Sequence, residues 1–229
     1  MTEGEWLADI KAECRAILAQ GRALVVIVPT ALTPPPGQGL TEAEQARAAR
    51  YGFQADHRAF TLGHMLTRGL LLEDGQIEDF ALGPYGKPFL PNAPGFNLAH
   101  SGGFLTLVVG NSPWLGIDIE TGPRDGKYRD LLIPVCHPAE RAYLAGRGLD
   151  AFLKCWTRKE ALLKARGTGL SDDLTQIDTR LGETMPFFSG EPSLVVFDLP
   201  LKTAGPPLVG AVALPPGLGV PLYRIYGAD

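Results

Sequence analysis

Three carboxylates in two short segments of this chain could do chemistry together. Asp118 and Glu120 alternate with isoleucines in the segment GIDIE, and Glu160 lies further along the chain, one helical turn before Lys164. Because successive side chains of a strand point to opposite faces, we expect Asp118 and Glu120 to be neighbours on one face. Two carboxylates about 7 Å apart repel by roughly 2 kcal/mol, so we expect a cation between them.

Carboxylate oxygens suit a hard cation such as Mg²⁺, which commonly takes one or two of them and leaves its other positions to waters and substrate phosphates. An ordinary strand with a polar face also shows such alternation, and on GIDIE alone that simpler interpretation is favoured. Glu160 and Lys164 likewise match a plain surface pair that contributes about 0.3–0.5 kcal/mol. Spacing alone leaves both interpretations open.

A strand and a helix must position these acids. Residues 151–166 have the periodicity of a helix, and Gly167 is predicted to end it in a left-handed conformation. Residues 104–109 and 114–120 are predicted strands, and the Gly-Asn-Ser-Pro segment 110–113 between them is typical of a hairpin turn. We therefore predict a hairpin that presents the acidic pair rigidly.

The remaining elements follow from periodicity and turn residues. Residues 3–20 are predicted to form an amphipathic helix, which either packs on a sheet or offers its apolar stripe to a partner. Thr41 and Glu44 form a capping-box pattern at another helix start. Long and short helices are predicted at 56–72 and 138–146, strands at 23–28, 80–82, 175–180, 193–199, 208–214 and 222–226, and loops at 33–39 and 121–130.

Four blocks together resemble the 4′-phosphopantetheinyl transferases of the surfactin-synthetase-activating (Sfp-like) type. They are GKP at 86–88, FNLAHS at 96–101, GIDIE at 116–120 and WTRKEALLKARGTGL at 156–170, in the family's order. The pairing of the last two blocks is specific, whereas GKP or the HS dipeptide would mean little alone. The resemblance extends from about Ala23 to the C-terminal strands and leaves roughly the first twenty residues uncovered.

The resemblance implies a transferase that moves the phosphopantetheine arm of coenzyme A, its co-substrate, onto a serine of an apo acyl, peptidyl or aryl carrier protein. Adenosine 3′,5′-bisphosphate would be released. Attack of a serine hydroxyl on a pyrophosphate needs a metal across the phosphates, cations for the developing charge and a base for the proton. The residue types in the four blocks fit those needs.

By the same resemblance, Asp118, Glu120 and Glu160 match the family's Mg²⁺ ligands. Glu160 is also the candidate for taking the serine proton, directly or through a water. Lys164 matches the lysine that contacts the phosphates, and His100 the histidine on a phosphate of coenzyme A. Without the resemblance, an isolated histidine such as His100 is more often a packed or hydrogen-bonded core residue.

Other residues are predicted to bind coenzyme A. The resemblance places Arg58, Lys87, Pro88 and Ser101 in this set, and Arg47 or Arg50 is a candidate for the 3′-phosphate because a guanidinium suits phosphate well. A solvated helix face accounts equally well for the last two arginines, and a solvated turn lysine is the alternative for the lysine of GKP.

The fold implied by the resemblance is α+β, a pseudo-twofold monomer of two similar helix-plus-sheet halves with coenzyme A and Mg²⁺ in the cleft between them. Residues 1–21 would be an N-terminal helical extension. Residues 22–115 would form the first half, and residues 116–229 the second half, which carries the metal ligands.

Composition agrees with this picture. The 229 residues are enough for one large or two small domains, and a net charge of −4 argues against nucleic acid as a partner. The N-terminus is acidic and no apolar run approaches the ~20 residues that span a bilayer, so we expect neither a signal peptide nor a membrane span.

The three cysteines, Cys14, Cys136 and Cys155, are odd in number and have no CxxC spacing. This disfavours a disulfide framework and a zinc site and indicates a reducing cytoplasm. We assign Cys155 no chemistry.

Two other functions are compatible with the same residues. A Mg²⁺-dependent hydrolase would cleave the pyrophosphate of coenzyme A with water and release phosphopantetheine without a carrier. A non-catalytic module would hold coenzyme A or a carrier protein. The complete set of three acids and Lys164 argues against the second, because a binder that does no chemistry has no need of it.

Overall fold

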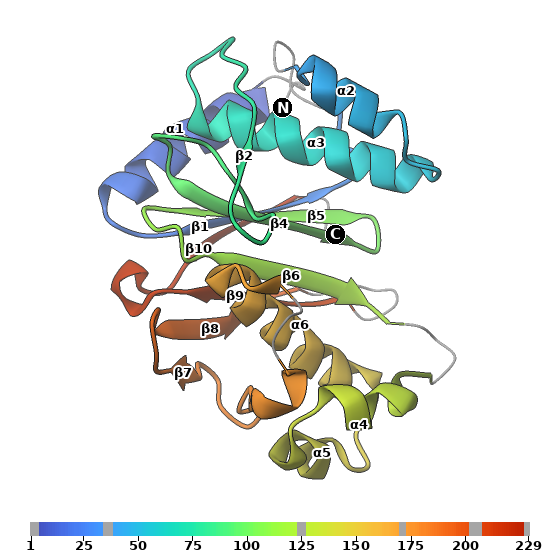
Figure 1. Cartoon of the computed structure of the whole chain (residues 1–229). Helices are drawn as coiled ribbons and strands as arrows, with labels where there is room; N and C mark the ends of the chain where they lie inside the picture. Colours follow the sequence, from blue (N-terminus) through green and yellow to red (C-terminus); the bar gives the residue numbers. More distant parts are fainter. Residues whose placement is uncertain (1–4, 34–38, 123–126, 170–172, 202–207, 227–229) are drawn as a thin grey trace.

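The computed structural model describes residues 5–33, 39–122, 127–169, 173–201 and 208–226 (Figure 1). Within these ranges, two four-stranded sheets and a two-stranded ribbon combine with helices. The α+β class predicted from the sequence is confirmed, whereas the pseudo-twofold relation of two halves and their boundary stay predictions. Among the described helices, each is too short or too polar to cross a bilayer.

The elements before residue 111 are, in chain order, α1 (Glu5–Ala19), β1 (Leu24–Pro29), α2 (Glu42–Ala48), α3 (Gln54–Leu71), β2 (Ala81–Leu82), β3 (Pro88–Phe89), β4 (Gly95–Ser101) and β5 (Phe104–Gly110). The later elements are β6 (Gly116–Thr121), η1 (Lys127–Leu131), α4 (Leu132–Val135), α5 (Pro138–Leu144), α6 (Leu149–Arg166), η3 (Leu174–Gln176), β7 (Phe187–Phe188), β8 (Leu194–Asp198), β9 (Leu208–Leu214), η4 (Pro216–Leu218) and β10 (Leu222–Ile225).

The first sheet has the order β10-β1-β5-β4, with β1 and β10 parallel and the other pairs antiparallel. The second has the order β6-β9-β8-β7 and is antiparallel throughout. The last strand of the chain therefore returns to the first sheet, although it follows the second in sequence (Figure 1).

Apolar residues on both faces of β1 explain the stacking of layers. Leu24, Val26 and Val28 pack with α1 and α3, whereas Val25 and Ile27 pack against the second sheet. The outer face of the second sheet is covered by α6 through a third apolar cluster. The order of layers is thus α1 and α3, first sheet, second sheet, α6, and the helix at 3–20 packs as a core element, as one of its two interpretations predicted.

Several local predictions are confirmed. The capping box of Thr41 and Glu44 opens α2, and Pro138 opens α5. Gly167 ends α6 with a φ of 71°, the left-handed conformation that glycine adopts without a steric penalty. Most of the loop at 33–39 and part of the loop at 121–130 lie outside the described residues.

The hairpin predicted at 104–120 is wrong. β5 pairs with β1 on one edge and with β4 on the other, so no edge of it is left for β6, which pairs with β9 in the second sheet. The segment 111–115 therefore carries the chain from one sheet to the other. The side chains of β5 are buried on both faces, so this strand belongs in the middle of a sheet. With β1 and β4 as neighbours, its backbone groups are paired on both edges, which a hairpin with β6 alone would not achieve.

The strand predicted at 175–180 is also wrong. The short helix η3 ends at Gln176, and the following backbone is irregular. Side chains from α5 and α6 take up the backbone groups that a ladder would need: the ammonium of Lys159 donates to Ile177 O, and Thr179 N donates to Oε1 of Glu140 at 2.8 Å. These side-chain bonds replace strand pairing here.

Candidate functional site

The strand that carries GIDIE lies directly against α6. A Cβ on Gly116 would stand 2.0 Å from Ala161 O and 2.4 Å from Ala165 N, so only glycine permits this approach. Ile117 and Ile119 lie in the core between the two sheets. The alternation predicted from the sequence therefore places the two acids on the opposite face, toward the helix.

Asp118 is the most buried of the three acids, with 4% of its surface exposed. Its Oδ1 accepts a hydrogen bond from Lys164 Nζ at 2.6 Å, and its Oδ2 is buried with no hydrogen-bond partner. Burial, with smaller contributions from the charges of Glu120 and Glu160, raises the pKa of this carboxyl to about 7 in spite of the ammonium of Lys164. A buried carboxylate oxygen without a partner needs a cation or a proton.

The other two acids face the same space. Glu160 is half-buried on α6, where burial raises the pKa of its carboxyl and the charge of Glu120 adds to the increase. Oε2 of Glu120 accepts a hydrogen bond from Ser101 Oγ at 3.1 Å. Three acids thus share the charge of Lys164, and the paired side chain is Asp118 rather than the Glu160 that helical spacing suggested.

A bound divalent cation would balance the excess negative charge of three carboxylates beside one ammonium. The unpartnered Asp118 Oδ2 and the all-oxygen donor set fit a hard ion such as Mg²⁺. Among the described residues, the carboxylate oxygens of the three acids do not all come within 4.8 Å of one another.

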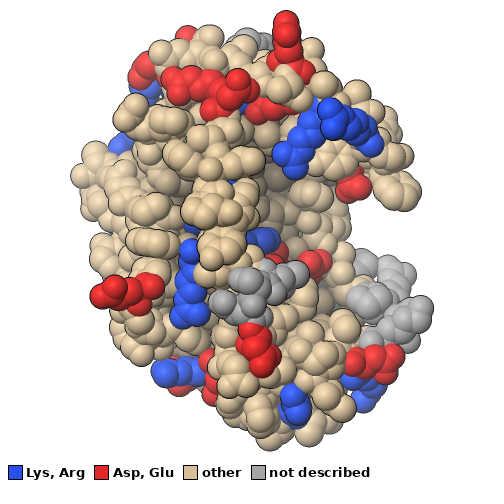
Figure 2. All heavy atoms as spheres, in the orientation of Figure 1, with Lys and Arg blue, Asp and Glu red and all other residues tan. Residues whose placement is uncertain are grey.

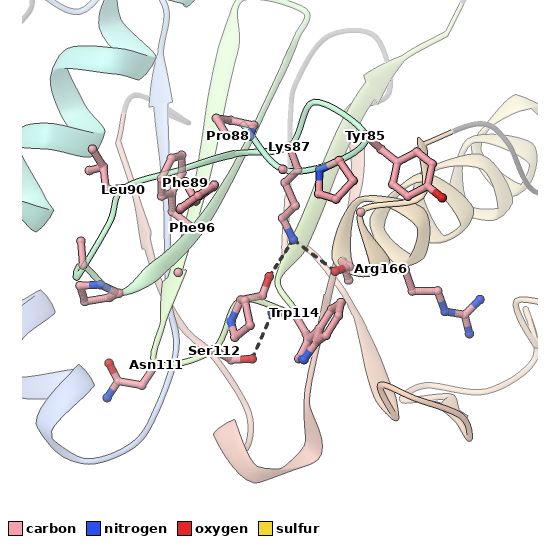
Figure 3. Close-up of a pocket in the computed structure, with 18 of the residues that line it drawn as sticks. Tyr85, Lys87, Pro88, Phe89, Leu90, Phe96, Asn111, Ser112, Trp114 and Arg166 are labelled. Carbon is pink, nitrogen blue, oxygen red and sulfur yellow. Dashed lines mark hydrogen bonds between the residues drawn. The ribbon is translucent and has the colours of Figure 1, made fainter. Parts of the chain in front are cut away.

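Lys87 of the GKP turn points inward rather than to solvent. Its Nζ donates to Pro113 O and Leu115 O, both at 2.8 Å, and to Ala165 O at 3.2 Å. Burial lowers the pKa of the ammonium to about 8. These three bonds connect the turn to the start of β6 and the end of α6, so Lys87 would reach a phosphate only by leaving these carbonyls (Figure 3).

A cavity of ≈ 820 Å³ opens beside Lys87 (Figure 3). Its walls come from residues 83–96, 111–114 and 165–167, and the rings of Tyr85 and Trp114 are exposed there. Of the predicted site residues, Lys87 and Pro88 line this cavity. No spacing along the chain signals this cavity, because its walls come from three separate segments.

His100 and Ser101 lie at the other end of β4 from the cavity. The side chain of His100 is exposed, whereas Ser101 faces β6, where its Oγ also accepts a hydrogen bond from Thr121 N at 3.1 Å. The structure therefore brings Ser101 to the acidic site through Glu120. It leaves His100 free of the core, available to a ligand.

Three arginines are exposed in this region: Arg47 on α2, Arg50 in the turn after it and Arg58 on α3. Figure 2 shows Lys and Arg side chains gathered over these helices, above a hollow in this face of the molecule. The guanidinium of Arg47 lies over the ring of Phe60, 5.3 Å from its centroid. The arrangement is suited to a phosphate approaching from the hollow.

Two buried charged residues of α6 were not recognised from the sequence. Lys159, part of the WTRKE block, is fully buried and bonds Glu140 at 2.8 Å, while Arg158 bonds Asp198 through two nitrogens. A signal was present, since Arg158, Lys159 and Glu160 are consecutive and point in different directions around a helix that packs on more than one side. Cys136, Glu140 and Cys155 also converge, with one ligand atom of each within 4.8 Å of the others.

Comparison with known proteins gives consistent results. A model of the 4′-phosphopantetheinyl transferase superfamily matches residues 115–200, which contain all three acids and Lys164. Relatives include the 4′-phosphopantetheinyl transferases HetI of Nostoc sp. (31% identical over 161 residues, 64% of this chain and 67% of that protein), psf-1 of Bacillus pumilus (34% over 159 residues, 61% and 63%) and Sfp of Bacillus subtilis (29% over 155 residues, 60% and 65%). The matches thus span about two thirds of the length of these relatives.

Proposed function

Because this chain belongs to the 4′-phosphopantetheinyl transferase superfamily, we propose that it transfers the phosphopantetheine arm of coenzyme A to a serine of an apo carrier protein. The reaction would depend on Mg²⁺ and release adenosine 3′,5′-bisphosphate. The single observation that carries this proposal is the buried, unpartnered oxygen of Asp118. This acid, Glu120 and Glu160 together have one nearby ammonium, that of Lys164.

Asp118, Glu120 and Glu160 would hold the Mg²⁺, which when bound supplies positive charge to the pyrophosphate of coenzyme A. Lys164 lies at the same site, 2.6 Å from Asp118 Oδ1. Its ammonium would stabilise the negative charge that develops on the phosphate oxygens.

Glu160 would take the proton of the attacking serine. Burial raises the pKa of its carboxyl in the metal-free protein, whereas a bound Mg²⁺ would lower its basicity, so this role rests on the position of Glu160 at the site and on the resemblance to the family. As the serine oxygen bonds to phosphorus, the bond from phosphorus to the bridging oxygen breaks. The electron pair leaves on adenosine 3′,5′-bisphosphate, and the serine proton passes to Glu160 directly or through a water.

The remaining predicted residues would hold coenzyme A. The exposed Arg47, Arg50 and Arg58, on α2, in the turn after it and on α3, would contact phosphate, with Arg47 or Arg50 at the 3′ position. His100, exposed at the end of β4, would contact a second phosphate. Ser101 would support Glu120, and Lys87 with Pro88 would shape the turn beside the cavity (Figure 3).

We also propose that the protein acts as a cytoplasmic monomer without a nucleic-acid or membrane partner. The net charge of −4 supports the first exclusion. The three cysteines are free thiols, as expected in a reducing compartment.

The test is to incubate the protein with Mg²⁺, coenzyme A and each of several apo carrier proteins, and to weigh the carriers. We expect a carrier to gain the mass of one phosphopantetheine arm, and the gain to vanish with EDTA. Free phosphopantetheine formed without a carrier would indicate a hydrolase instead. Tight binding of coenzyme A with no turnover on any carrier would indicate a binding module.

A further inference from the structure

Two thiols face each other inside the second half of the molecule. Cys136 Sγ and Cys155 Sγ are 3.9 Å apart, and both residues are fully buried. Cys136 directly follows α4, and Cys155 lies on α6, so the pair joins two elements that are separate in the fold. The described bonds of each thiol are with the other thiol.

The nearby acid does not make this a metal site. Oε1 of Glu140 accepts from Thr179 N and Oγ1 at 2.8 and 2.6 Å, and its Oε2 accepts from His137 N at 2.7 Å and Lys159 Nζ at 2.8 Å. With four hydrogen bonds, the carboxylate has no lone pair left to donate. A divalent cation here would also lie beside a buried ammonium.

We propose that Cys136 and Cys155 form a buried dithiol that a peroxide converts reversibly to an intramolecular disulfide linking α4 to α6. A disulfide needs its sulfurs about 2 Å apart, so the two thiols must close by roughly 2 Å. Neither the dithiol nor the disulfide carries charge, which suits a buried position. This inference is independent of the proposed transferase activity.

The surroundings favour Cys136 as the sulfur that reacts first. The hydrogen bond from Cys155 lowers the pKa of the Cys136 thiol, and the charges of Lys159 and Arg141 act in the same direction. Access is also easier on that side, because Ile133 and Pro134 are exposed and α4 has only four residues. A helix of this length opens readily and uncovers the residue that follows it.

The chemistry balances with one peroxide. The Cys136 thiolate attacks a peroxide oxygen, the O–O bond breaks, and a sulfenic acid forms; the hydroxide that leaves takes the proton that the thiol released and becomes water. The Cys155 sulfur then attacks the Cys136 sulfur, forming the S–S bond and breaking the S–O bond, and a second water leaves with the remaining proton. The two thiols lose two electrons, which the peroxide gains. A small dithiol reductant restores both thiols.

The experiment treats the folded, fully reduced chain with hydrogen peroxide, then removes the peroxide and titrates thiols in denaturant. We expect the titre to fall from three thiols per chain to one, with the intact mass lower by two hydrogens. A non-reducing digest should link the peptides of Cys136 and Cys155. Cys14, which is also fully buried but has no thiol neighbour among the described residues, is the matched control and should stay free.

Variants sharpen the result. Cys14→Ala should lose two thiols at the wild-type rate, whereas Cys155→Ser should accumulate a sulfenic acid at Cys136 that dimedone traps. If Cys155→Ser does not fold, peptide mapping of the wild type remains decisive. Three thiols after peroxide treatment, oxidation of Cys14 at the same rate, or stoichiometric zinc in the reduced protein would each overturn the proposal.

Discussion

Two sides of one helix, α6, differ in whether their buried charged groups have partners. On one side Lys159 and Arg158 are fully buried, and each has an acid partner, Glu140 or Asp198, together with backbone carbonyls. On the other side, toward β6, Lys164 faces an Asp118 carboxyl that still has an unpartnered oxygen. The first side is complete and holds the fold, whereas the second is incomplete until a ligand arrives.

The complete side should be sensitive to loss of a single partner. Glu140→Ala removes the countercharge of Lys159 and the acceptor for two donors of Thr179. We expect the free energy of unfolding to fall by about 3–5 kcal/mol, measured by urea denaturation, because a buried charge is left uncompensated. Glu183→Ala is the control: Glu183 is an exposed partner of Arg180, and its loss should change stability by less than about 0.5 kcal/mol. An equal loss of unfolding free energy in the two variants would show that the buried pair contributes no more to stability than the exposed one.

The incomplete side should be sensitive in activity and not in stability. Asp118→Asn keeps the size of the side chain and removes the proposed ligand charge. We expect carrier modification to slow by about 100-fold or more, with the melting temperature unchanged or raised. A variant that folds normally and modifies the carrier within a few-fold of the wild-type rate would show that Asp118 does not serve the metal.

The two sides should also differ in their dependence on pH. In the metal-free folded protein burial raises the pKa of the Asp118 carboxyl to about 7, whereas the unfolded chain releases this proton near the ordinary pKa of 3.8. The folded state therefore binds more protons between these pH values, so stability falls as pH rises through that window, by roughly 4 kcal/mol. Thermal unfolding from pH 4 to 8 without divalent ions should show this decline, and Asp118→Asn should reduce it. An unchanged slope in the variant would assign the decline to other groups.

A smaller effect is expected where α6 ends. Gly167 has a φ of 71°, so Gly167→Ala places a Cβ in a left-handed conformation and should reduce stability by about 1–2 kcal/mol. Gly148→Ala at the N-cap of the same helix, where φ is −83°, is the control and should change stability less. The two melting curves would coincide if the left-handed cap were unimportant.

Local patterns predicted much of the fold and of the site. The alternation in GIDIE correctly placed Asp118 and Glu120 on the face opposite the isoleucines, and the glycine after α6 correctly marked its end. The partners of β5 and of β6 could not be predicted from the sequence. The Gly-Asn-Ser-Pro segment indicates a turn, but it does not indicate which sheet the next strand joins. Strand partners depend on burial of both faces, which is a property of the whole fold.

Charge was the harder feature to interpret. Lys159 and Lys164 belong to the same block and differ by five positions, yet one is a structural ion pair and the other faces the acidic site. Helical spacing suggested Glu160 as the partner of Lys164, and the structure shows Asp118 from a strand instead. Contacts across elements are not encoded in spacing along one element, which also explains why the cavity beside Lys87 was not foreseen.

The most direct test of the account is to count bound divalent ions. Mn²⁺ can replace Mg²⁺ and be followed by electron paramagnetic resonance in the presence of coenzyme A. We predict one Mn²⁺ per chain, displaced by Mg²⁺, lost in Asp118→Asn and retained in Asp198→Asn, whose acid already has arginine and lysine partners. Equal Mn²⁺ binding by the wild type and by Asp118→Asn would contradict the claim that the incomplete side of α6 is a metal site.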